Sequence, residues 1–213
     1  MKSNFKLLAK LTLLTTAGLF TASSFAATQP AEITNFNARR THDVFTVKSK
    51  GWSDPAFGDM GWTHFSDWGS FTAKRHQKVT IKLVSETVGI HPGVTVWFRG
   101  ADDTAPDSYV VDHFYPQYAN FTKFGAVDET TGESLGNIVM RVVAYGYDQD
   151  GNTKVVRRFK GIKDNVPGQL ELTFTAPARG QYQFVVGGIN PDAGVDNTPK
   201  YNIDTTVTKV IAP

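Results

Sequence analysis

Residues 169–186 read QLELTFTAPARGQYQFVV, and this stretch decides the fold class. Apolar residues alternate with polar ones over 169–175, and they do so again over 181–186. An apolar side chain at every second position is typical of a strand with one buried face. The short break between the two runs contains Ala178-Arg179-Gly180, which we interpret as a hairpin connection between antiparallel strands.

The same pattern extends along most of the chain. Runs rich in β-branched and aromatic residues, each bounded by Gly, Pro, Asn or Asp, recur at 43–47, 79–84, 94–99, 138–145, 154–159 and 201–207. Asp148-Gln149-Asp150-Gly151-Asn152 is a second expected hairpin turn, because Asp-Gly tolerates positive φ angles. No segment after residue 26 has helical periodicity. The sequence therefore predicts an all-β fold, an antiparallel β-sandwich of immunoglobulin-like or jelly-roll character with long aromatic-rich loops.

The first 26 residues have the pattern of a secretory signal peptide. Lys2, Lys6 and Lys10 lead into an apolar run over 7–20, and Ser24-Phe25-Ala26 supplies the small residues of a cleavage site. We therefore expect residues 1–26 to be a signal peptide and residues 27–213 to form a single domain. Such a protein is exported, to the periplasm or to the outer cell surface.

Composition excludes several function classes. The chain has no cysteine, so thiolate catalysis and thiolate metal sites are ruled out. Its net charge of +2 falls to −1 when the three lysines of the leader are removed, which predicts no general attraction to nucleic acid or to anionic lipid. There is no evident Ser/His/Asp arrangement, and we predict that the protein is not an enzyme.

Two stretches depart from the strand pattern. Residues 51–69 hold three of the four tryptophans, and residues 101–133 are rich in Asp, Thr, Tyr and Pro. Loops of this length in a compact domain tend to be functional. The first contains Trp62 and His64, whose side chains share a face if the segment is extended, and the second contains His113.

The five histidines do not form a compact zinc motif, so any metal site must be assembled from distant segments. We interpret His76 and His91 as surface or turn residues, and His42 as the start of a strand at a sheet edge. His64 and His113 differ because each has aromatic neighbours, and an apolar surrounding favours the neutral imidazole that binds metals. From the residues alone, a hydrogen-bonded histidine beneath an aromatic cluster is the better explanation for either of them.

Trp62-Thr63-His64 and the later His113 resemble the copper site of the CorA and MopE proteins, surface-associated copper(I)-binding proteins of methane-oxidising bacteria. The resemblance implies that His64, His113 and Trp62 oxidised to kynurenine hold a copper(I) ion. It also implies a role in copper acquisition or storage and an association with the outer cell surface. An unmodified Trp62 stacked beside the metal is the alternative for that residue.

Copper(I) prefers sulfur but also accepts imidazole, and Met60 is the one methionine near the motif, more simply explained by packing. Calcium is a second candidate ion. Asp148-x-Asp150-Gly151-Asn152 lacks the later Glu of an EF-hand, and Asp192 and Asp196 lie in what we interpret more simply as a solvated loop.

Two other functions stay open. One is a metal-free carbohydrate- or surface-binding sandwich with a stacking platform formed by Trp52, Trp68, Trp97 and Tyr118. The other is an oxidative copper enzyme with a histidine at its mature amino terminus. The expected first residue is Ala27, which argues against the second.

Overall fold

The computed structural model describes residues 33–48, 66–107, 109, 120–128, 131–152, 161–189 and 200–210. The strands that it defines are β1 (Ile33–Phe36), β2 (His42–Lys48), β3 (Asp67–Ala73), β4 (Lys78–Ser85), β5 (His91–Phe98), β6 (Asn120–Val127), β7 (Ser134–Asp148), β8 (Gly161–Ile162), β9 (Gln169–Thr175), β10 (Gly180–Ile189) and β11 (Lys200–Val210). Among these residues there is no helix of the length and hydropathy that a bilayer crossing requires.

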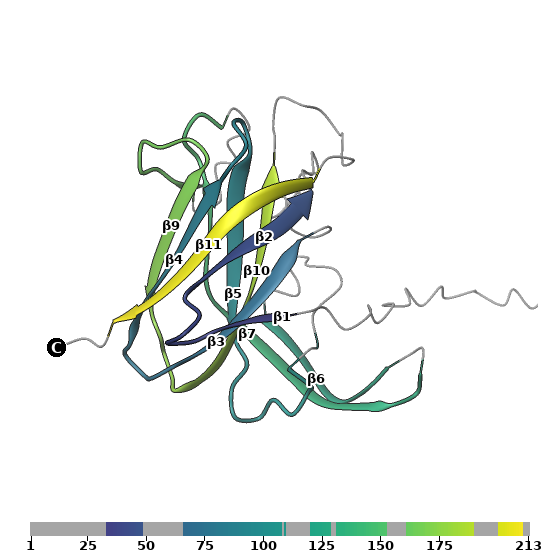
Figure 1. Ribbon diagram of the computed structural model, residues 1–213. Coiled ribbons are helices and arrows are strands. Elements are labelled where there is room, and N and C mark those ends of the chain that lie inside the picture. Colours follow the sequence, from purple (N-terminus) through teal and green to yellow (C-terminus); the bar gives the residue numbers. More distant parts are fainter. Residues whose placement is uncertain are drawn as a thin grey trace, which may run out of the picture.

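The strands form two sheets that face each other, as Figure 1 shows. One has seven strands, in the order β1-β3-β10-β5-β7-β6 with β8 paired to β7, and the other has four, in the order β2-β11-β4-β9. All pairs are antiparallel except β1 with β3 and β7 with β8, which are parallel. The predicted all-β sandwich is therefore confirmed.

Aromatic rings fill the space between the sheets. Phe45 of β2 stacks on Phe184 of β10, with ring centroids 6.0 Å apart, and this contact joins the two layers. Phe71 and Tyr182 stack at 5.4 Å on neighbouring strands. Gly69 leaves room for the ring of Phe184, because a Cβ at that position would overlap the ring. Each of these aromatic side chains is fully buried, so the core consists of closely packed rings without a disulfide.

The seven-stranded sheet is buried on its outer face as well. A second apolar cluster lies there, which we call the outer cluster; its buried members are Trp68, Trp97, Ala105, Ala126, Ile138, Met140, Tyr147 and Val185. Trp68 and Trp97 stack with centroids 5.6 Å apart and planes 20° apart. Alternation explains the two faces, since Phe184 points toward the other sheet while Val185 points into the outer cluster.

The expected hairpin at Ala178-Arg179-Gly180 is wrong. The strand before it, β9, belongs to the four-stranded sheet, and the strand after it, β10, belongs to the seven-stranded sheet. The connection therefore crosses from one layer to the other. A short polar turn can serve either arrangement, and the choice depends on where each apolar face finds its partner.

A turn is present at Asp150-Gly151, with Gly151 at φ 68°, but the expected hairpin is not seen among the described residues, since β8, the next described strand, pairs with β7 in parallel. The strand expected at 154–159 lies outside the described residues. Both stretches expected to be loops contain strand residues, since β3 begins at Asp67 and β6 occupies Asn120–Val127.

Candidate metal site

The three predicted ligands, Trp62, His64 and His113, lie outside the described residues, as do Trp52, Met60, Tyr118, Asp192 and Asp196. The structure does describe the residues that flank the two ligand segments. Residues 49–65 follow the end of β2 and lead to Ser66 at the start of β3, and residues 110–119 lie between Tyr109 and β6. The placement of these flanks limits where the two segments can run.

The first flank is fixed by Trp68, four residues after His64. Trp68 points to the outer face of the seven-stranded sheet, where it stacks on Trp97 of β5. Its strand is held on both sides, because Trp68 pairs with Ile33 of β1 and with Val185 of β10. The chain that leaves residues 49–65 therefore enters the sheet directly at the outer cluster.

The second flank is Tyr109, four residues before His113, and it packs against the same outer cluster. Its carbonyl oxygen accepts a hydrogen bond from Gln183 Nε2 at 2.9 Å and another from Arg99 Nη1 at 3.3 Å. Gln183 is buried in the middle of β10. The backbone of Tyr109 is thus attached to the outer face of the sheet that also carries Trp68.

A buried ion pair completes this attachment. Arg99 donates from Nε to Asp103 Oδ2 at 2.9 Å and from Nη2 to Asp103 Oδ1 at 2.8 Å, and both side chains are about 95% buried. Arg99 also donates from Nη1 to Gln183 Oε1 at 2.9 Å. Asp103 accepts the backbone N–H of Val139 at 2.6 Å, so the carboxylate ties residues 99–109 to β7. We call Arg99, Asp103 and Gln183 the polar clasp.

His91 is not the surface residue that its position before Pro92-Gly93 suggests. It is the first residue of β5, 5% exposed, and its Nδ1 lies 2.7 Å from Asp148 Oδ2 on β7. The Asp148 side chain also accepts the backbone N–H groups of Gly168 and Asp150. His91 therefore holds the ends of β5 and β7 together, and its partner is 57 positions away in sequence.

The other two described histidines lie where the sequence places them. His42 begins β2, an edge strand of the four-stranded sheet, and it is exposed, with Nε2 3.3 Å from Asp204 Oδ1. His76 is exposed in the turn between β3 and β4 and has a positive φ of 64°. The exposed position of each of these two histidines agrees with the interpretation from the sequence.

No group of three His, Cys, Asp or Glu side chains within the described ranges could hold a metal ion. The two described carboxylates considered for calcium, Asp148 and Asp150, accept hydrogen bonds from the backbone. Asp150 Oδ2 accepts N–H groups from Asp164 and Asn165, at 2.7 and 2.8 Å, while Asp148 binds His91 and Gly168. These carboxylates stabilise the loop that connects β8 to β9.

Trp68 and Trp97, the two described residues of the stacking platform considered for carbohydrate, are not available for binding a sugar. Trp68 is 8% exposed and Trp97 is fully buried, and the two rings stack on each other. A sugar ring requires an accessible indole face, and neither ring offers one. These tryptophans form part of a packed core.

The described part of the chain is thus a cysteine-free β-sandwich, and Trp68 and Tyr109, which flank the two histidine-bearing segments, pack on one face of its seven-stranded sheet. The family model for copper(I)-binding proteins of the CorA-like type matches residues 25–196, and the chain belongs to this family. The family is one of copper-binding proteins. Comparison with curated protein sequences finds no match.

Two solved structures are similar. One is CorA of Methylomicrobium album BG8, described as a surface-associated copper-binding protein important in copper acquisition. It is 32% identical, the alignment covers 84% of this chain and 98% of that chain, and the TM-score is 0.71. The other is the secreted protein MopE of Methylococcus capsulatus, described as binding copper with the help of an oxidised tryptophan. It is 18% identical over 79% of this chain and 84% of that chain, with a TM-score of 0.50, and this likeness supports the fold alone.

Proposed function

We propose that this protein is exported and captures copper(I) for acquisition, with His64, His113 and an oxidised Trp62 as the ligands. The single observation that carries the proposal is the common location of Trp68 and Tyr109 on the outer cluster. Each of these residues is four positions from a proposed histidine ligand. Four residues span at most about 14 Å of extended chain, so the length of each connection allows both histidines to reach the same face of the sheet.

The ligand set suits copper(I). This closed-shell ion accepts few ligands, and imidazole binds it where thiolates are absent, as they are in a chain without cysteine. Two neutral histidines leave a monovalent ion without a third strong donor. Oxidation of Trp62 to kynurenine supplies one, because the product carries an aryl amine with a free lone pair while the indole nitrogen does not.

The oxidation balances with dioxygen and water. Dioxygen cleaves the C2–C3 bond of the indole to give N-formylkynurenine, and water then releases the formyl group as formate. The net change replaces one carbon atom by one oxygen atom and raises the mass by about 4 Da. A redox-active metal beside an indole is a suitable place for this reaction, which follows copper binding in our proposal.

Peptide mass mapping together with metal analysis tests this function. We expect about one copper ion for each chain on the basis of a single three-ligand site. The mass increase should map to the peptide that contains Trp62 and to no peptide that contains Trp68 or Trp97, because those two rings are buried in the outer cluster. Purified protein that takes up no copper would refute the function, and copper uptake with an unmodified Trp62 would refute only the kynurenine ligand.

A further inference from the structure

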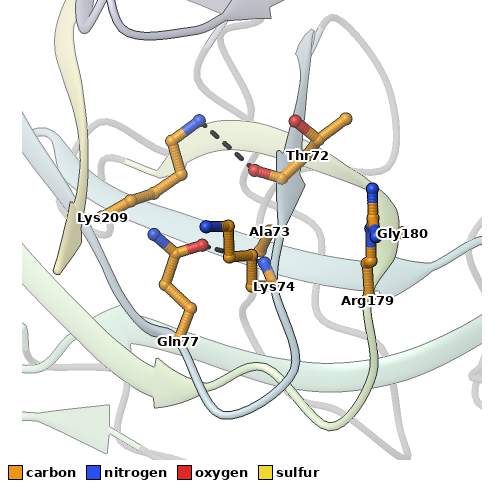
Figure 2. Close-up of a pocket in the computed structure, with 7 residues that line it drawn as sticks. All are labelled: Thr72, Ala73, Lys74, Gln77, Arg179, Gly180 and Lys209. Carbon is orange, nitrogen blue, oxygen red and sulfur yellow. Dashed lines mark hydrogen bonds between the residues drawn. The ribbon is translucent and has the colours of Figure 1, made fainter. Parts of the chain in front are cut away.

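A hollow with a volume of about 380 Å³ opens at the end of the sandwich where β3 and β11 finish. Its lining residues come from the end of β3, the turn before β4, the connection before β10 and the end of β11; they are Thr72, Ala73, Lys74, Gln77, Arg179, Gly180 and Lys209. Figure 2 shows Lys209 and Gln77 on one side, Arg179 on the opposite side and Lys74 between them. The volume is sufficient for a small hydrated ligand.

The lining carries three positive charges and no negative one. Lys74, Arg179 and Lys209 come from three separate segments, and no acidic residue lines the hollow. Within the described part of the chain, none of the three cations takes part in an ion pair. Their charges are therefore not neutralised locally, in a protein whose net charge without the leader is −1.

Lys209 is held in place by the backbone. Its Nζ donates to the carbonyl oxygens of Thr72 at 3.3 Å and Phe36 at 3.5 Å, and it lies 5.8 Å from the centre of the Phe71 ring. Burial lowers the pKa of this ammonium group, because the charged form is partly desolvated. An anion beside Lys209 would favour its charged form.

The other polar groups of the lining are arranged as hydrogen-bond donors. Gln77 Oε1 accepts the backbone N–H of Lys74 at 2.9 Å, which fixes the amide and leaves Nε2 as the donor on its other side. Ammonium, guanidinium and amide N–H groups facing one space form a donor set that matches an oxyanion.

We propose that this hollow binds a phosphate-type oxyanion, either as a free ion or as the headgroup of a surface lipid. A doubly charged phosphate has several acceptor oxygens, and the planar guanidinium of Arg179 and the two ammonium groups are suited to share them. The hollow consists of described residues and shares none of them with the proposed copper ligands.

The location of the hollow gives the proposal a functional meaning. It lies at the end of β3 that is marked by Ala73, whereas residues 49–65 join β3 at Asp67. Seven strand residues separate these ends by about 20 Å. An anionic surface bound at the hollow would therefore lie at the opposite end of β3 from Ser66, the first described residue after the segment that contains Trp62 and His64.

Isothermal titration calorimetry tests the site. The full mature chain is titrated with inorganic phosphate in chloride buffer at pH 7.5. We expect saturable binding that weakens as ionic strength rises. Arg179→Gln and Lys74→Gln should each weaken it about tenfold, because each removes one charge-assisted hydrogen-bond donor. Both side chains are exposed, so the fold tolerates the changes.

Lys82→Gln is the matched control, since Lys82 is exposed on β4 and does not line the hollow. It should bind phosphate as the unmodified protein does. Absence of saturable binding, or an equal loss in Lys82→Gln, would overturn the proposal. Copper content should be the same in all of these variants.

A second arm identifies the source of the anion. Phosphatidylcholine vesicles with and without phosphatidic acid, whose headgroup is a phosphate monoester, are sedimented with the protein. Cosedimentation that requires phosphatidic acid and is lost in Arg179→Gln supports a lipid headgroup. Phosphate binding without cosedimentation supports a free anion.

Discussion

Gln183 Nε2 donates a hydrogen bond to the carbonyl oxygen of Tyr109 at 2.9 Å, and this contact joins the centre of β10 to the segment that leads to His113. Gln183 Oε1 meanwhile accepts from Arg99. One buried amide therefore satisfies a backbone carbonyl and a guanidinium, and it places the start of a proposed ligand segment on the outer face of the seven-stranded sheet.

Replacing Gln183 tests whether this contact positions the copper segment. Gln183→Leu keeps a similar volume but removes an acceptor from Arg99 and a donor from Tyr109. We expect the free energy of unfolding to fall by about 1–3 kcal/mol, as for other buried groups left without a partner. Copper affinity, measured by competition with a chromogenic copper(I) chelator, should fall as well. Gln181→Leu is the control, on the same face two residues away; equal affinities in the two variants would contradict a positioning role.

The ion pair of the polar clasp allows a sharper test of stability. Arg99→Met leaves Asp103 about 95% buried without its cation, and we expect a loss of about 3–5 kcal/mol in urea unfolding. Arg40→Met removes the cation of an exposed pair, Arg40–Asp43 at 2.7 Å, and should cost less than about 1 kcal/mol. A similar loss in both variants would show that burial does not decide the strength of these pairs.

The proposed ligands are tested by single replacements among the histidines. His64→Ala and His113→Ala should each lose most of the bound copper while the thermal unfolding temperature of the metal-free protein stays nearly unchanged, because neither residue belongs to the described core. His42→Ala and His76→Ala are matched controls at exposed positions and should keep their copper. Metal analysis of the four purified variants gives the result, and equal copper retention in all four would reject the ligand assignment.

Tyr182 predicts a stability change at alkaline pH. Burial raises the pKa of its phenol, and the hydrogen bond with the backbone of Ala178 only partly offsets this. The folded state therefore holds the proton more tightly than the unfolded state. The resulting stability is fully present below about pH 10, the ordinary tyrosine value, and is lost as the pH rises through the higher folded pKa.

Tyr182→Phe removes this titration. At pH 7 the variant should be less stable by about 0.5–1.5 kcal/mol, because Tyr182 Oη no longer donates to the carbonyl of Ala178 at 2.6 Å. Above pH 10 the difference from the unmodified protein should shrink. Urea unfolding at both pH values measures it, and a constant difference would contradict a titrating Tyr182.

Much of the fold could be predicted because alternation is a local signal. The runs at 79–84, 169–175 and 201–207 fall within β4, β9 and β11, each with one face in the core. The sequence does not predict strand β3, DWGSFTA, because this strand is buried on both faces and so lacks a simple alternation. It also contains Gly69, where a Cβ would overlap the ring of Phe184. That ring is more than 100 positions away, and no local pattern reveals it.

The side-chain partners were harder to predict for the same reason. His91 lies before Pro92-Gly93, a sequence typical of turns, yet its carboxylate partner Asp148 makes it a buried connection between strands. The polar clasp includes Gln183, and the role of this residue depends on its hydrogen bond to the carbonyl oxygen of Tyr109, which is distant in sequence. Trp62, His64 and His113 were selected through resemblance to a family, and as ligands they stay predictions.

The strand order also determines when this chain can fold. The two last long strands are central, since β10 lies between β3 and β5 while β11 lies between β2 and β4, with Lys200 opposite Lys48. Neither layer can be completed before β10 and β11 have left the ribosome, and contacts so distant in sequence form slowly. Pairs such as β5 with β7 can form earlier, but each sheet then still lacks a central strand. For a protein that we propose is exported, we expect this order of strands to delay completion of the fold until late in synthesis.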